Sequence, residues 1–185
     1  LSEWLDVRVF SEGKIYEQKY KRGDVIQPLT VIGDTDEHGT YVHFKPDGEI
    51  FETLIFSCST LVNHLRETAF LTKGLKINLK DLREDKDRDP DDVKKDVGKN
   101  FSFHYEGGIK EFVQYINRTR TPLYPEIFYA EGSKDGVLVE VALQHNDEYN
   151  ETIFSFVNNI NTIDGGTHLA GFKSGLTKTV NDYGR

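Results

Sequence analysis

Hydrophobic and polar residues alternate along the first 45 residues with the period of two that is typical of half-buried β-strands. Leu5, Val7 and Val9 alternate with polar neighbours, and the turn Glu12-Gly13 follows them. Four strands are predicted, over residues 5–10, 14–20, 29–32 and 40–44. Because short turns separate consecutive strands, this order predicts an antiparallel meander.

The period changes at Ser57, where apolar residues begin to recur every three or four positions. This spacing predicts helices over residues 57–71, 109–116 and 169–180. Ser57 or Ser59 is expected to cap the first of them. Further strands are predicted over residues 75–79, 101–105, 126–130, 137–144 and 152–158. The order of elements predicts an α+β fold, with helices on one face of a mixed sheet.

Residues 83–100 carry no such pattern, and 13 of these 18 residues are charged. Asp85, Asp87 and Asp89 have the spacing of the first three ligands in an EF-hand loop. However, Pro90 and Asp96 stand where that loop needs a glycine and a glutamate. The composition therefore favours a solvated, mobile hairpin loop over a calcium site.

The composition is that of a globular protein without a membrane span, with 37% hydrophobic and 29% charged residues. No apolar run approaches the roughly 20 residues that a bilayer span needs. A net charge of −8 argues against a chain-wide grip on nucleic acid, although a local basic patch stays possible. Its candidate members are Lys110, Arg118, Arg120, Lys173, Lys178 and Arg185. The single cysteine, Cys58, fits a reducing cytoplasm.

The turn-rich stretch NNINTIDGGTH, residues 158–168, is the most conspicuous candidate site. His145, Asp164 and His168 could ligate a metal, but no HExxH or CxxC spacing accompanies them. A phosphate cradle is a second interpretation, but the P-loop lysine is missing. The structural alternative is a strand-to-helix turn, in which Asp164 or Thr167 caps the following helix.

Several long segments are similar to the B subunits of bacterial type IIA DNA topoisomerases. They are FHYEGGIKEFVQYIN, VEVALQHND, FSFVNNINTIDGGTHLAGFKSGLTK, LSEWLDVRVFSEGKIYEQKYKRG, GTYVHFKPDGEIF and LRETAFLTKGLKINLKD. Together they cover the chain except for residues 83–100, a segment longer than the resemblance leads us to expect. The form FHYEGGIKEF favours the DNA gyrase branch over the paralogous topoisomerase IV branch. A non-catalytic scaffold of the same fold is the alternative from another class.

The resemblance implies both a domain organisation and an activity. Residues 1–105 would be the distal part of a GHKL-type ATPase α/β sandwich, and residues 106–185 the N-terminal part of a ribosomal-protein-like transducer domain. The whole protein would hydrolyse ATP with Mg²⁺ and negatively supercoil DNA by strand passage in the cytoplasm. Its implied partners are the A subunit of gyrase, double-stranded DNA and, through ATP-dependent dimerisation, a second B subunit.

The resemblance places few site residues in this chain. The family's general-base Glu, its Mg²⁺-binding Asn, its adenine-reading Asp and its ATP lid are expected before Leu1, and the lysine that contacts the γ-phosphate after Arg185. We therefore expect a piece of a longer protein, with no catalytic residue or metal ligand and no activity by itself. Thr40 matches the family threonine under the adenine, and Val42 would line the same pocket, which also binds aminocoumarins in this family. The stretch from Asp164 to His168 matches a turn of the transducer.

Overall fold

The computed structural model describes all 185 residues, and the chain folds into two compact units. The first comprises Leu1–Phe56 with Asp85–Asp89, and the second Ser57–Glu84 with Pro90–Arg185. The α+β class predicted from the sequence is confirmed. No helix is both long and apolar enough to cross a lipid bilayer. The predicted domain boundary near residue 105 does not coincide with the division between these two units. It separates parts with different expected functions and stays a prediction.

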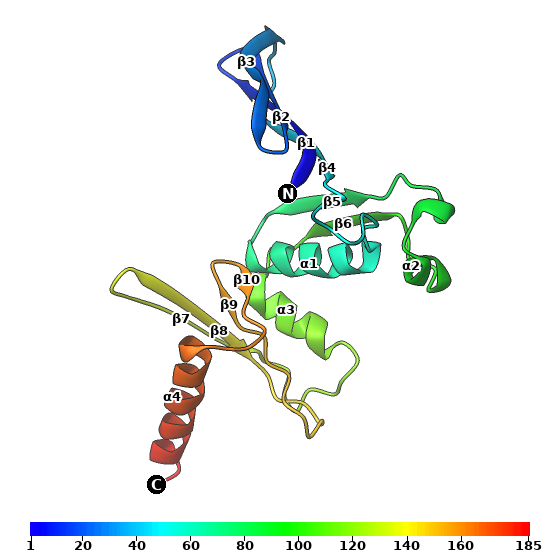
Figure 1. Cartoon of the computed structure of the whole chain (residues 1–185). Helices are drawn as coiled ribbons and strands as arrows, with labels where there is room; N and C mark the ends of the chain where they lie inside the picture. The colour runs from blue at the N-terminus through cyan, green and yellow to red at the C-terminus, as the bar shows by residue number, and fades with distance from the viewer. The chain divides into compact units, whose positions relative to one another are not determined.

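The first unit contains a four-stranded antiparallel sheet with the strand order β3-β2-β1-β4 (Figure 1). Its strands are β1 (Ser2–Ser11), β2 (Lys14–Lys21), β3 (Asp24–Asp34) and β4 (Gly39–Pro46). All four predicted strands are therefore present, and β1, β2 and β3 form the predicted meander. The prediction is wrong for β4, which pairs with β1 instead of β3.

The path of the β3–β4 loop explains this difference. The last residue of β3 pairs with the first residue of β2, and Gly39 of β4 pairs with Phe10, so the loop begins and ends beside the β1–β2 turn. The two edge strands of a four-stranded sheet lie about 14 Å apart, and the five Cα–Cα steps from Asp34 to Gly39 can span about 17 Å. The loop is thus long enough to pass round that turn, where the Thr35 N–H donates to the Gly13 carbonyl over 3.0 Å. Pairing with β1 satisfies a second row of backbone groups on that strand.

The core of the second unit lies between a helix and a hairpin, which are α1 (Cys58–Leu71), β5 (Lys76–Lys80) and β6 (Asn100–His104). Ser57 caps α1 as predicted, because its hydroxyl accepts the N–H of Thr60 over 3.3 Å. Val62 and Ala69 of the predicted apolar face are buried against Phe103 of β6. The helical period of the sequence thus identified the buried face of α1.

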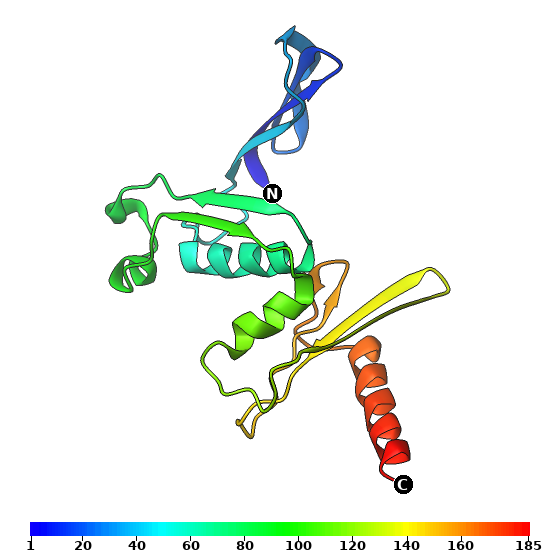
Figure 2. The ribbon, with the colours of Figure 1, turned by 180° about the vertical axis from the view of Figure 1, so that it is seen from behind.

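A second helix, α3 (Gly108–Asn117), covers the opposite side of α1 (Figure 2). Phe70 of α1 is 1% exposed and lies at the centre of an aromatic cluster. Its ring centroid is 3.6 Å from that of Tyr105, 5.0 Å from that of Phe112 and 5.4 Å from that of Tyr115. Stacked and tilted aromatic pairs add specific contacts to the burial of apolar area. The cluster therefore joins residues on both sides of position 105.

The remaining elements are η1 (Asp85–Asp87), α2 (Pro90–Lys94), β7 (Phe128–Lys134), β8 (Val137–Leu143), β9 (Phe156–Val157), β10 (Ile160–Asn161) and α4 (Thr167–Tyr183). In the second unit β5–β6, β7–β8 and β9–β10 are separate two-stranded sheets. Every strand pair in the chain is antiparallel, so the expected mixed sheet is not formed. In the second unit each strand pairs with the strand that precedes or follows it in the sequence.

Candidate functional site

One face of the β1–β4 sheet is apolar and contains both predicted nucleotide-binding residues. Val42 pairs with Val7, and Thr40 pairs with Val9, so these four side chains share one face of the sheet. The pairing adds Leu5, Tyr16, Gln18, Tyr20, Val31 and Phe44 to this face. Thr40 is exposed, and Val42 is 55% exposed. The apolar face thus presents a mainly hydrophobic wall that includes the hydroxyl of Thr40.

The opposite face of the same sheet is polar and internally paired. Glu17 is 6% exposed, and its carboxylate accepts hydrogen bonds from Arg8 over 2.8 Å and from Gln27 over 3.1 Å. Lys19 Nζ lies 3.5 Å from the same carboxylate. These partners, Arg8 first, hold the pKa of Glu17 below its usual value, although burial acts in the other direction. Arg8, Glu17 and Lys19 on the polar face already pair with one another. The face with Thr40 is therefore the candidate ligand face.

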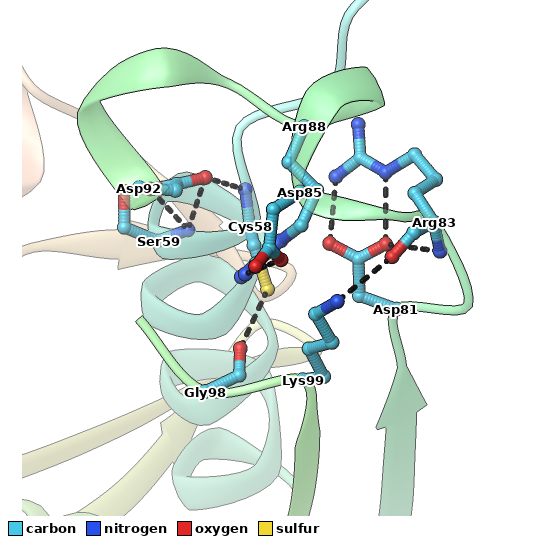
Figure 3. A network of polar contacts seen from close by, with 9 residues as sticks. All are labelled: Cys58, Ser59, Asp81, Arg83, Asp85, Arg88, Asp92, Gly98 and Lys99. Carbon is cyan, nitrogen blue, oxygen red and sulfur yellow. Dashed lines mark hydrogen bonds and ion pairs between the residues drawn. The ribbon is translucent and has the colours of Figure 1, made fainter. Parts of the chain in front are cut away.

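The charged segment contains a buried carboxylate that sequence reasoning missed. Asp92, in α2, is 1% exposed, and its carboxylate accepts the backbone N–H groups of Cys58 and Ser59 in the first turn of α1 (Figure 3). The first N–H groups of a helix lack partners within the helix, and a negative charge there is stabilised by the helix dipole. The predicted solvated hairpin loop is therefore wrong for this segment, which closes the N-terminus of α1.

Ion pairs order the two ends of the same segment. Arg83 contacts the Asp81 carboxylate through both Nε and Nη2 at 2.8 Å, and Lys99 Nζ donates to the Arg83 carbonyl over 3.0 Å (Figure 3). Arg88 is 5% exposed and lies 3.4 Å from Asp85. No group of three or more His, Cys, Asp or Glu side chains is arranged to hold a metal ion, so the EF-hand spacing does not produce a metal site.

The turn-rich stretch forms a tight hairpin followed by a helix start. Asn158 and Asn159 have φ angles of 48° and 65°, as the two central residues of a type I′ turn require, and they join β9 to β10. The predicted strand over 152–158 is shortened to β9, and the chain reverses directly after it. Gly166, with φ of 155°, occupies the N-cap position of α4 without a side-chain hydrogen bond. The prediction that Asp164 or Thr167 caps this helix is therefore wrong.

The three candidate metal ligands have separate partners. His145 Nδ1 lies 2.6 Å from the Tyr124 hydroxyl, and His168 Nε2 lies 3.1 Å from Thr162 Oγ1. The histidines and Asp164 do not form a metal-binding group. Thr167 is the first residue of α4. Within residues 158–168, His168 thus contacts Thr162 and no metal-binding group is formed. The match of this stretch to a turn of the transducer stays a prediction.

The six candidate basic residues lie in different surroundings. Arg120 pairs with Glu148 at 3.0 Å, whereas Arg118 and Lys110 lie over tyrosine rings. Only Lys173, Lys178 and Arg185 line one shallow groove, on α4, and Lys173 is paired with Glu151 at 2.6 Å. The six cations therefore do not form one basic patch.

Comparison with known proteins agrees with the resemblance. A family model described as DNA gyrase B matches residues 108–185. The DNA gyrase B subunit of Clostridium acetobutylicum is 53% identical and that of Halalkalibacterium halodurans 50% identical, each over the whole of this chain. The chain spans 27% of the length of each of these relatives. The crystallised 43K ATPase domain of Thermus thermophilus gyrase B, in complex with an aminocoumarin, is also similar.

That structure superposes with a TM-score of 0.78 and 38% identity over 99% of this chain and 47% of its own. The similarity therefore includes both compact units, and it is a match of fold as well as of sequence. Together these matches show that the chain belongs to the family of DNA gyrase B subunits.

Proposed function

We propose that this chain is part of an ATP-hydrolysing B subunit that, together with the A subunit of gyrase, negatively supercoils DNA by ATP-driven strand passage. The observation that carries the proposal is the 53% identity to a gyrase B subunit over the full length of the chain. Within the family, residues 1–105 would complete the ATPase domain and residues 106–185 would begin the transducer. The start of the family-model match at residue 108 supports this division.

The apolar sheet face with Thr40 and Val42 would form one wall of the adenine pocket. An adenine ring needs an apolar surface against its face and a hydrogen bond at its edge. Thr40 supplies a hydroxyl, and Val42 supplies the apolar surface two residues along β4. Since the related Thermus thermophilus domain was crystallised with an aminocoumarin, we expect the same face to contact that class of inhibitor.

The chemistry itself would belong to other parts of the protein. General-base attack of water on the γ-phosphate needs a carboxylate, Mg²⁺ and positioned donors. No side-chain cluster in this chain is arranged as a metal site. The 185-residue chain alone would therefore neither bind Mg²⁺–ATP tightly nor hydrolyse it. ATP-dependent dimerisation with a second B subunit, contact with double-stranded DNA and a cytoplasmic location are parts of the same proposal.

The test uses the full B subunit reconstituted with relaxed plasmid and the A subunit of gyrase. We expect ATP-dependent negative supercoiling and its inhibition by an aminocoumarin. Relaxation and decatenation without supercoiling would favour the topoisomerase IV alternative. Failure of the full protein to bind a non-hydrolysable ATP analogue in a calorimetric titration would favour the non-catalytic scaffold instead.

A matched pair of variants tests the pocket wall. Thr40→Ala in the full protein should weaken binding of the ATP analogue about tenfold, the value of one hydrogen bond of about 1.4 kcal/mol. Thr30→Ala makes the same chemical change on the opposite, polar face of the sheet, because Thr30 pairs with Glu17. Equal affinities for the two variants would contradict the assignment of Thr40.

A further inference from the structure

Three residues that follow α1, Thr72–Gly74, contact several segments that come later in the sequence. The Gly74 N–H donates to the Tyr105 carbonyl over 3.1 Å, and the Asn159 amide donates to the Thr72 hydroxyl over 3.2 Å. In both Figure 1 and Figure 2 the orange β9–β10 hairpin reaches the end of α1. The type I′ turn of that hairpin is therefore attached to this short segment.

Lys73 makes the most specific of these contacts. Its aliphatic stem lies across the backbone of Gly108, where an added Cβ would be 2.5 Å from Lys73 Cε and 3.0 Å from Cγ. Gly108 also has φ of +60°, which side chains rarely adopt. The second glycine of the sequence EGGIKEF is therefore favoured by two features, a positive φ and the close passage of a lysine side chain.

The charged end of Lys73 reaches the β7–β8 hairpin. Lys73 Nζ is 5.6 Å from the centroid of the Tyr129 ring and 3.8 Å from Glu140 Oε1. Lys110 Nζ is 4.8 Å from the centroid of the same ring. The Tyr129 hydroxyl lies 2.8 Å from both Glu131 and Glu140.

Two cations accompany this arrangement. A phenol has one hydrogen and can donate it to only one of the two glutamates at a time. This hydrogen bond removes no charge from either glutamate, and the ammonium groups of Lys73 and Lys110, which are attracted to the face of the Tyr129 ring, offset that charge. Removal of the Lys73 charge leaves two carboxylates close together with only one cation beside them. Lys73 thus links the end of α1 to the β7–β8 hairpin through one ion pair and one ring contact.

We propose that Thr72–Gly74 is a coupling joint, in which Lys73 positions the β7–β8 hairpin and transmits nucleotide-driven movement between the parts on either side of residue 105. This inference rests on the proposed function of the whole protein. Lys73 is a positioning residue, since it contacts the hairpin and no proposed substrate. A joint made of two cations, one ring and two carboxylates can loosen without unfolding the aromatic core around Phe70.

The test is the Lys73→Met variant of the full B subunit, combined with the A subunit of gyrase. Methionine keeps an unbranched stem over Gly108 and removes the charge. ATP hydrolysis without DNA should stay within about twofold of the wild type, whereas supercoils introduced per ATP should fall about fivefold or more, the lower end of coupling between sites. Lys73→Arg should restore the ratio, because arginine keeps the cation over the ring. Lys76→Met, an exposed lysine three residues away in β5, is the matched control.

The outcomes separate the joint from the function. A Lys73→Met protein with the wild-type number of supercoils per ATP would overturn the joint and leave the proposed function intact. A wild-type protein without ATP-dependent supercoiling would overturn the proposed function, and the joint with it. Loss of coupling in Lys76→Met as well would show a general effect of charge and would also overturn the joint.

Discussion

Asp92→Ala is the change for which the structure gives the sharpest expectation. The substitution removes a carboxylate that is 1% exposed and leaves the N–H groups of Cys58 and Ser59 without this acceptor. Loss of a helix cap costs about 1 kcal/mol, and loss of a hydrogen bond to a buried charged group costs about 1.5–3 kcal/mol. These two values describe the same contacts, so they are not additive. We expect a loss of about 3 kcal/mol in the free energy of opening the N-terminus of α1.

The single thiol of the chain offers a local assay. Cys58 is the first residue of α1 and is 1% exposed, so a thiol reagent can react only after this helix end opens. The labelling rate, divided by that of the denatured chain, measures the opening equilibrium. A loss of about 3 kcal/mol corresponds to labelling about 100-fold faster in Asp92→Ala. Asp87→Ala removes an exposed carboxylate from the same charged segment and should change the rate by less than about twofold.

The pH dependence gives an independent check. Burial alone would raise the pKa of Asp92, but hydrogen bonds from Ser59 and Cys58 outweigh it, so the pKa lies below its usual value. A carboxyl group with a lowered pKa in the folded state contributes stability above its unfolded pKa of about 4, and loses it as the pH falls through the folded pKa. Opening should therefore become easier for the wild type below about pH 4, and less so for Asp92→Asn. An Asp92→Ala chain that labels within about threefold of the wild type would refute the reasoning.

Three further changes have defined outcomes. Gly108→Ala should lower the free energy of unfolding of the second unit by about 1–3 kcal/mol, because φ is +60° and the new Cβ meets Lys73. Chemical denaturation would measure this, and an unchanged midpoint would contradict it. Arg8 holds the pKa of Glu17 low, so the wild type should lose stability as the pH falls, and Glu17→Gln should lose less. Thermal melting at pH 7 and pH 3 tests this, and an equal fall of the melting temperature in both proteins would argue against it. Asn158→Gly should be tolerated in the type I′ turn whereas Asn158→Ala should cost about 1 kcal/mol, a difference that amide exchange of β10 would report.

Local patterns in the sequence determined most of the secondary structure. The period of two identified the strands of the first sheet, and the helical period identified α1, α3 and α4. The N-cap of α1 was narrowed to Ser57 or Ser59, and the structure selects Ser57, whose hydroxyl accepts the N–H of Thr60. The α+β class follows from the order of these elements. The long motifs placed the chain in its family, since collinear segments carry information that periodicity does not.

Contacts between distant residues were decided only by the tertiary structure. The pairing of β4 with β1 depends on which edge the chain can reach after β3, and alternation gives no information about this. Asp92 contacts the N-terminus of α1 across 34 residues, so a charged stretch that looked solvated contains a buried cap. The close contact between Gly108, the second glycine of EGGIKEF, and Lys73, 35 positions earlier, is visible only in the tertiary structure. Sequence patterns record which side chains prefer water, whereas a partner is chosen by the path of the chain and by the requirement that buried polar groups be paired.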